Sequence, residues 1–511
     1  MPGGNGRRLR RGAVAGWIGG LVALSACTVG PDYEKPAAPV PVAYKEAWKP
    51  GPVATGWRQA RPADGIDRGA WWSVYRDPVL DSLEREIDIS NQNLKAAEAA
   101  FREAEATVAA ARAQFFPTAA VNGSDTRSRT SGNGGKTTFG GGTIQNQFRA
   151  EATASWIPDL WGSVRRLVEG NIASAQASAA TLANVRLSAQ GTLATAYVEL
   201  RTADELARLL AQSVKAFEQA LKIVTNQYRG GTTDSSAVDQ AKAQLDATRA
   251  QLIAVQVTRG QLEHAIAVLT GKPPAALTIP PSETMLAVPL IPAELPSALL
   301  ERRPDIAAAE RDMQAANAQI GVDVAAFYPT VTLSADYGVS AEMLRKLFTS
   351  ASRIWSLGGT AAETIFDGGA RNAQLEHDKA AYDAAVATYR QTVLAAFQQV
   401  EDELLAQRVL AEQAVAQDSA VKAARSAEAT INNQYLAGTQ AYTAVIVAEN
   451  TALGDAETAL NIRQSRLVAS VALIEALGGS WDAAKIPSAD QIERDVPLDF
   501  NPLPPVVTPN K

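Results

Sequence analysis

Apolar residues recur along the chain with two different periods, and the change of period separates helices from strands. From Leu206 to Tyr228 they lie three and four residues apart, which is typical of a coiled-coil helix seam. From Val331 to Val339 every second residue is apolar, the pattern of a strand with one apolar face, and residues 144–156 alternate in the same way. The pattern predicts four strands, at about 117–130, 144–157, 329–340 and 353–366.

The helical stretches are unusually long. The segment from Gly162 to Asn226 contains no proline and would extend about 97 Å as one helix, at 1.5 Å per residue. Gly230-Gly231-Thr232 then interrupts the helical pattern, and Ala437-Gly438-Thr439 does so further along the chain. We therefore predict two helical hairpins whose tips lie at the end far from the strands.

The chain contains an internal duplication. Residues 93–118 align with 305–330, and 227–238 align with 434–445, in the same order. Each copy reads helix, strand, strand, helix, and most of the 26 prolines lie before, between or after the copies. The predicted divisions are a signal peptide at 1–26, an N-terminal lipid-anchored equatorial segment at 27–78, a first repeat at 79–271, an equatorial linker at 272–304, a second repeat at 305–479 and a C-terminal equatorial segment at 480–511.

The N-terminus predicts secretion and lipidation. Four arginines precede an apolar stretch, Gly12 to Ala23, that is short for a membrane helix, and Leu24-Ser25-Ala26-Cys27 follows. This pattern matches a bacterial lipoprotein signal, which would leave Cys27 as the acylated first residue, bearing N-acyl diacylglycerol. An ordinary cleavage site with a chance cysteine is the alternative. Because Thr28 rather than aspartate follows, we expect an outer-membrane anchor.

Composition and charge exclude several functions. The net charge of −6 becomes −10 when the four signal-peptide arginines are removed, so a nucleic-acid partner is not expected. With one cysteine and two histidines in the sequence, we predict no disulfide, metal site or catalytic site, and no cofactor beyond the acyl group on Cys27. We therefore predict that the protein is not an enzyme.

The strands predict assembly in a membrane. Each has the length of a transmembrane strand, and aromatic residues concentrate in 115–161 and 327–366, as in interfacial girdles. An open sheet edge is too costly in lipid, and four strands cannot close a barrel, so copies of the chain must pool their strands. A soluble sheet buried on one side is the alternative, but it explains neither the aromatic residues nor the anchor.

Three features together resemble a known family. They are the lipoprotein signal followed by Thr28-Val29-Gly30-Pro31-Asp32-Tyr33, the segment Leu299-Leu300-Glu301-Arg302-Arg303-Pro304-Asp305-Ile306, and the tip turns with Gly-Thr. They resemble outer-membrane efflux lipoproteins of the NodT and OprM type, among the TolC-like outer membrane factors. The resemblance implies a TolC-like homotrimer, with a twelve-stranded membrane β-barrel continuing into a long α-helical barrel in the periplasm.

The resemblance also implies a function. The trimer would be the passive exit duct of a tripartite efflux system, docking to a periplasmic adaptor and an inner-membrane RND-type pump. The competing hypothesis is a structural or adhesive trimeric lipoprotein without a conducting pore.

The hairpin tips hold the remaining candidate residues. The turn residues Gly231, Thr232, Gly438 and Thr439 are the expected adaptor-docking region. In the family, polar and acidic residues near the tips narrow the pore, and here Asp234, Asp239, Gln440 and Tyr442 occupy that region. Rings of carboxylates would favour cations. The alternative for the two aspartates is that they only cap the helix start beside the turn.

Overall fold

The computed structural model describes residues 28–41, 43–46, 70–129, 144–282, 284–289, 291 and 302–498. The predicted signal peptide, the lipidation residue Cys27, residues 47–69 of the predicted N-terminal segment, the stretch 130–143 and residues 499–511 lie outside the described residues, as does part of the linker at 272–304.

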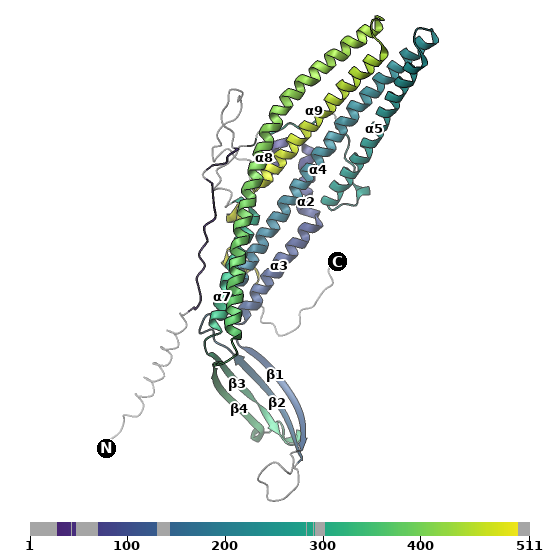
Figure 1. The fold of residues 1–511 in the computed structure, drawn as a ribbon. Helices are drawn as coiled ribbons and strands as arrows, with labels where there is room; N and C mark the ends of the chain where they lie inside the picture. Colours follow the sequence, from purple (N-terminus) through teal and green to yellow (C-terminus); the bar gives the residue numbers. More distant parts are fainter. Residues whose placement is uncertain are drawn as a thin grey trace, which may run out of the picture.

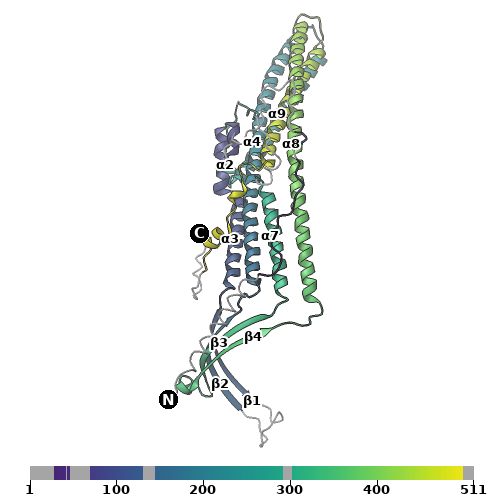
Figure 2. The same cartoon turned by 90° about the vertical axis from the view of Figure 1, so that its left-hand side faces the viewer.

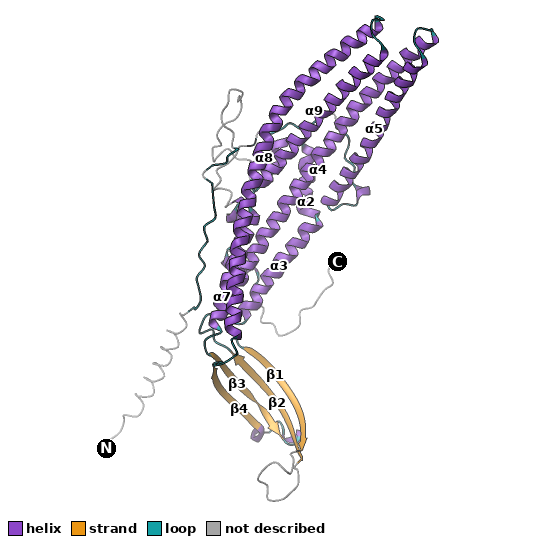
Figure 3. Cartoon of the chain, in the orientation of Figure 1, coloured by secondary structure: helices purple, strands orange, loops and turns teal. Residues whose placement is uncertain are grey.

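Helices and strands occupy separate ends of an elongated molecule (Figures 1 and 3). The α-helices of the described chain are α2 (Pro78–Ser90), α3 (Gln92–Ala113), α4 (Ser163–Arg229), α5 (Ser235–Leu269), α7 (Pro304–Ala325), α8 (Ala370–Leu436), α9 (Tyr442–Ala476) and α10 (Ala489–Asp495). The strands are β1 (Thr118–Arg129), β2 (Ile144–Trp156), β3 (Thr330–Ala341) and β4 (Arg353–Ala362). Short 3₁₀ turns are η1 (Trp71–Tyr75), η2 (Pro274–Ala276), η3 (Leu344–Lys346), η4 (Ser350–Ser352) and η5 (Ala483–Lys485).

The duplication is visible in the helix lengths. The helices α4 and α8 each have 67 residues, about 100 Å at 1.5 Å per residue, and α5 and α9 each have 35. The long helix predicted from Gly162 to Asn226 is α4, with Gly162 as its N-cap at φ +84°. Pro304 occupies the first turn of α7, where its missing N–H is not needed.

The strands form one antiparallel sheet in the order β1-β2-β3-β4. The register pairs Trp156 with Leu333 and Leu333 with Gly359. The edges of the sheet, β1 and β4, have no strand partner among the described residues. In Figure 2 the sheet curves away from the helices.

The fourth strand is shorter than predicted. The apolar pattern places its end near Phe366, but β4 ends at Ala362, which pairs with Thr330. Pro329 precedes Thr330 on the partner strand and has no N–H to donate, so the ladder stops there. The following residues turn the chain toward α8, where Asp367 accepts hydrogen bonds from Gly369 N and Arg371 N.

The largest apolar core lies at mid-length, between the sheet and the hairpin tips. It joins η1 and α2 to α4, α8 and α9, with Trp71 and Tyr197 both completely buried. The linker residues Ile279, Leu286 and Ile291 pack into the same core, as does Tyr44 of the N-terminal segment. The described parts of the N-terminal segment and of the linker therefore pack against the helices at mid-length.

Candidate functional site

The two faces of the sheet differ in polarity. Paired rows such as Val121–Ala152–Tyr337–Trp355 alternate with rows such as Asn122–Glu151 and Thr153–Asp336–Ser356. Tyr337 is 63% exposed and Leu357 75%, so the apolar face lacks a covering layer within the described chain. On the other face, Ser356 Oγ donates to Asp336 Oδ2 at 2.6 Å. A wall with lipid on one side and water on the other has this arrangement.

An aromatic group marks the end of the sheet nearest the helices. Trp156 Nε1 donates to Phe115 O at 3.0 Å, and Trp161 Nε1 donates to Pro329 O at 2.8 Å. The rings of Trp161 and Tyr328 stack with centroids 5.0 Å apart. Tryptophan and tyrosine with one polar contact and one apolar face are typical of a membrane surface.

The first described residues are fixed beside this group. Val29 N donates to Trp161 O at 3.1 Å, and the Cβ that Gly162 lacks would lie 2.8 Å from Thr28 Cγ2. Arg166, in the first turn of α4, donates to Asp32 Oδ1 at 2.7 Å. The chain after Cys27 therefore begins next to the helix end of the sheet.

The two tip turns have the same hydrogen bonds. Thr232 N and Oγ1 both donate to Gln227 O, at 2.9 and 3.0 Å, and Thr439 makes the same pair of bonds to Gln434 O. Gly231 at φ +73° and Gly438 at φ +76° take the left-handed conformation that such helix ends require. All four turn residues lie at the end farthest from the sheet (Figure 1).

An apolar cluster joins the two hairpins just behind the turns. Tyr442 packs with Val224, Ala237 and Val445, and its ring centroid lies 5.4 Å from that of Tyr435. Tyr442 is only 6% exposed, so within the chain its ring joins the hairpins and does not project freely. Tyr435 Oη donates to Gln227 Oε1, and the amides of Gln244 and Asn450 form two reciprocal bonds, of 2.7 and 3.1 Å.

The other predicted constriction residues are exposed. Asp234 is the N-cap of α5 and accepts from Ala237 N at 3.2 Å, which is the capping role predicted as an alternative. A hydrogen bond from Ser236 Oγ, and a weaker one from Ala237 N, lower the pKa of Asp234 below its ordinary value. Asp239, one turn further along α5, and Gln440, in the second turn, are also exposed. The structure does not bring the four into one cluster within the chain.

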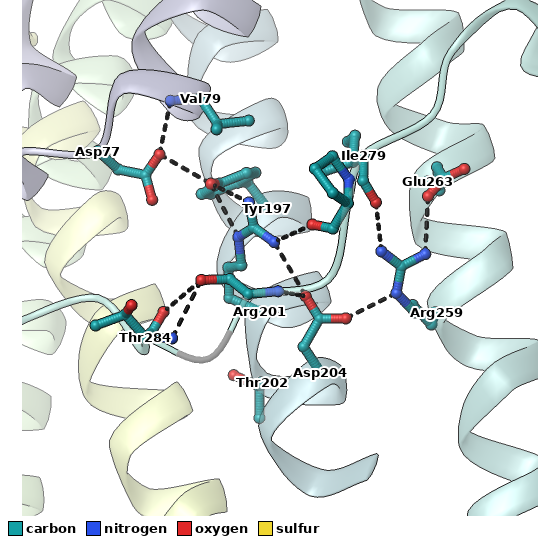
Figure 4. Close-up of polar contacts among 12 residues, drawn as sticks. Asp77, Val79, Tyr197, Arg201, Thr202, Asp204, Arg259, Glu263, Ile279 and Thr284 are labelled. Carbon is teal, nitrogen blue, oxygen red and sulfur yellow. Dashed lines mark hydrogen bonds and ion pairs between the residues drawn. The ribbon is translucent and has the colours of Figure 1, made fainter. Parts of the chain in front are cut away.

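A buried polar network that the sequence did not reveal lies at mid-length (Figure 4). Arg201 and Asp204 of α4 have side chains 4% and 2% exposed and are joined by a 3.0 Å ion pair. Arg259 of α5 binds the other oxygen of Asp204 at 2.7 Å and Glu263 at 2.8 Å. Asp204 also accepts from the linker residue Ser282 N at 3.1 Å.

The same network reaches the N-terminal helices. Both Arg201 Nε and Nη2 donate to Tyr197 Oη, which donates to Asp77 Oδ1 at 2.9 Å (Figure 4). Asp77 in turn caps α2 through Val79 N and Leu80 N. One set of polar contacts therefore ties α2, α4, α5 and the linker together.

The described residues include no group of three or more His, Cys, Asp or Glu side chains arranged to hold a metal ion. Among the helices of that part of the chain, none is both long and apolar enough to cross a membrane. His377, one of the two histidines, contacts Asp378 at 2.6 Å on α8.

Comparison with known proteins identifies relatives over most of the chain. Residues 85–272 and 295–479 match the family described as outer membrane efflux protein. The probable efflux pump outer membrane protein TtgC of Pseudomonas putida is 29% identical over 460 residues, covering 90% of this chain and 93% of that protein. The cation efflux system protein CusC of Escherichia coli is 27% identical over 463 residues, covering 90% and 97%. The solved structure of the outer-membrane channel OprN is 28% identical, with a TM-score of 0.81, and the match covers 89% of this chain and 99% of that one.

Proposed function

The chain belongs to the outer membrane efflux protein family, and on that premise we propose that three copies form the passive exit duct of a tripartite efflux system. The observation that carries the proposal is the sheet, which has an exposed apolar face, a polar face and two edges without a strand partner among the described residues. Three such sheets close a twelve-stranded barrel, with the apolar faces toward lipid. The helices α4 and α8, each about 100 Å long, continue the wall into the periplasm.

The duct does not supply energy, and a pump must drive transport. The relatives include outer-membrane components of efflux pumps and a channel. We propose that the chain receives substrates from an inner-membrane RND-type pump through a periplasmic adaptor. Conductance of the purified protein in a planar bilayer tests the duct. A folded trimer that conducts no ions would instead support the structural lipoprotein.

The adaptor contacts the hairpin tips in this proposal. Gly231, Thr232, Gly438 and Thr439 lie at the accessible end of both hairpins. Because the sequence has one cysteine, Thr232→Cys and Thr439→Cys each provide a single new crosslinking position. Both should crosslink to the co-expressed adaptor, whereas Thr126→Cys in β1 should not. Equal crosslinking at all three positions would contradict tip docking.

The anchor on Cys27 belongs to the same proposal. The residues that follow it, Thr28 and Val29, lie against Gly162 and Trp161, beside the aromatic group at the membrane end of the helices. An acyl group there would enter the adjacent leaflet, where each buried methylene contributes about 0.8 kcal/mol. Mass spectrometry of the N-terminal peptide should show N-acyl diacylglycerol on Cys27. An unmodified N-terminus in the mature protein would rule out the anchor.

A further inference from the structure

A groove lies between the two hairpins, with α9 as its floor and α4 and α8 on either side. Its volume is about 430 Å³, and its lining includes residues of all three helices and Val288 of the linker. Figures 1 and 2 both place α9 between α4 and α8 at this height, above the mid-length core. The duct proposal assigns no role to this groove.

Four arginines converge on the groove, and we call it the arginine groove. They are Arg208 of α4, Arg425 of α8, and Arg463 and Arg466 of α9. The carboxylates in its lining are Glu205 and Asp418, so the lining carries a net charge of +2. The chain as a whole carries −6, which makes this local charge opposite in sign to that of the molecule.

Part of this positive charge is not neutralised by contacts among the described residues. Arg208 is bound to Glu205, with Nε 3.0 Å from Oε2. Arg463 donates Nη2 to the carbonyl of Leu286 at 3.1 Å, which is a neutral acceptor. The structure gives the Arg425 side chain no hydrogen bond or ion pair to a described residue. Glu428 lies one turn away on α8. Burial raises the pKa of its carboxyl, and the positive charge of Arg425 lowers that pKa only in part.

Arg466 provides the strongest indication of a ligand. Its Nε is buried and has no hydrogen-bond partner within the described part of the chain. A buried charged donor without an acceptor is costly, and such groups in folded proteins usually bind an ion or water. The planar guanidinium group matches the oxygens of carboxylates and phosphates, which it binds with paired, charge-assisted hydrogen bonds.

We propose that the arginine groove binds a small soluble oxyanion, a carboxylate or phosphate, through Arg463 and Arg466 with Arg425 closing the site. The bound anion would supply the acceptor that Arg466 Nε lacks and would join α9 to α8. Since the site is formed within one chain, anion binding can be measured on the purified protein. The result does not depend on whether the protein exports a substrate.

The test uses the full-length protein purified from outer membranes in detergent. Sodium phosphate and sodium citrate are titrated separately by calorimetry, with sodium chloride at matched ionic strength as the blank. The wild type should bind at least one of the two anions and show a higher thermal unfolding temperature in its presence. The anion that binds more tightly identifies the ligand class.

The double variant Arg463→Gln, Arg466→Gln should bind that anion about tenfold more weakly or worse, as expected when a charge-assisted hydrogen bond is lost. The matched control is Arg249→Gln, Arg390→Gln, which removes two exposed arginines of α5 and α8 outside the groove and should bind as the wild type does. If the double variant fails to fold, the single variant Arg425→Gln at an exposed position of α8 should still show weaker binding. No binding of either anion by the wild type, or equal affinity in wild type, double variant and control, would overturn the proposal.

Discussion

At the scale of single residues, Asp204 joins two long helices and the linker through one buried carboxylate. Its two oxygens accept from Arg201, Arg259 and Ser282 N, which belong to α4, α5 and the linker. The carboxylate is 2% exposed, so water cannot replace these contacts. Removing one member of a buried, hydrogen-bonded ion network leaves the others uncompensated.

We therefore expect Asp204→Asn to destabilise the protein by about 3 kcal/mol, since it leaves the buried Arg201 and the partly buried Arg259 facing a neutral amide. The matched control is Glu218→Gln on the same helix, whose ion pair with Arg249 is nearly half exposed on both sides. Exposed pairs contribute about 0–1 kcal/mol, so this variant should unfold almost as the wild type does. Urea titration of both variants measures the difference, and equal midpoints would contradict the role given to Asp204.

Substitutions of Asp234 and Asp239 test whether these residues narrow the pore at the hairpin tips. Three copies of each near the tips would form carboxylate rings, in which Asp234, whose pKa is lowered by its hydrogen bonds, is ionised at neutral pH. Asp234→Ala with Asp239→Ala should reduce the preference for cations in planar-bilayer conductance. Because Asp234 also caps α5, Asp234→Asn with Asp239→Asn is needed as well, since asparagine keeps the cap and removes the charge. Unchanged selectivity in both pairs would leave these residues with a capping role alone.

The contacts of Tyr442 and of the buried polar network around Asp204 could not be predicted from the sequence. The position of Tyr442 after the Gly-Thr turn makes it a candidate pore residue, and its contacts with the other hairpin, where its ring is 6% exposed within the chain, could not be predicted from that position. In the sequence, nothing distinguishes Arg201, Asp204 and Arg259 from other charged residues of the predicted helices. Their burial arises only when the linker crosses α4 and α5 at Ile279 and Pro280, a tertiary contact that helical periodicity does not encode.

At the scale of elements, the sequence predicts helices and strands better than it predicts the contacts of single residues, because the spacing of apolar residues depends on the type of element. The alternation in 331–339 and 144–156 reflects one face toward lipid, and the structure has strands there. The end of β4 was predicted less well. Apolar residues continue through Ile365 and Phe366, but the ladder depends on the partner strand, which begins only at Thr330 after Pro329.

Within the α8–α9 hairpin, Glu449 should make stability depend on pH. Burial, together with the nearby charge of Glu428, raises the pKa of Glu449 to about 7 from an ordinary value of 4.5. Its Oε2 has no hydrogen-bond partner among the described residues. The folded state therefore holds this proton over a pH range in which the unfolded chain has lost it, so stability falls as the pH rises from about 4.5 to about 7.

The thermal unfolding temperature should consequently be higher at about pH 5 than at about pH 8. Glu449→Gln removes the titrating group and should reduce that difference. Glu412→Gln, an exposed position on α8, is the matched control and should keep the wild-type dependence. If both variants show the same pH dependence as the wild type, the buried carboxyl of Glu449 does not contribute to it.

At the scale of the whole molecule, a single chain cannot close a barrel in the membrane. The part of the chain that the structure describes has four strands, in which β1 and β4 have one edge each without a strand partner. In lipid, only further copies of the chain can satisfy these edges. The need for an assembly follows from the number of strands and the cost of an open sheet edge in lipid, so the sequence alone predicts it. The arginine groove could not be predicted in this way, because its residues come from three helices that meet only after both hairpins have formed.

Which face of the sheet meets lipid can be tested at two adjacent residues of β4. Leu357 lies near the middle of the strand on the apolar face, 75% exposed, and Ser356 lies on the polar face, bonded to Asp336. An arginine facing lipid near the bilayer centre costs about 2–4 kcal/mol, whereas an arginine in the lumen remains in water. Leu357→Arg should therefore reduce the yield of assembled trimer in the outer membrane. Ser356→Arg should assemble normally, with its charge beside Asp336 changing the single-channel conductance. The reverse result, in which Ser356→Arg blocks assembly and Leu357→Arg does not, would mean that the polar face is turned toward lipid and that the proposed barrel is wrong.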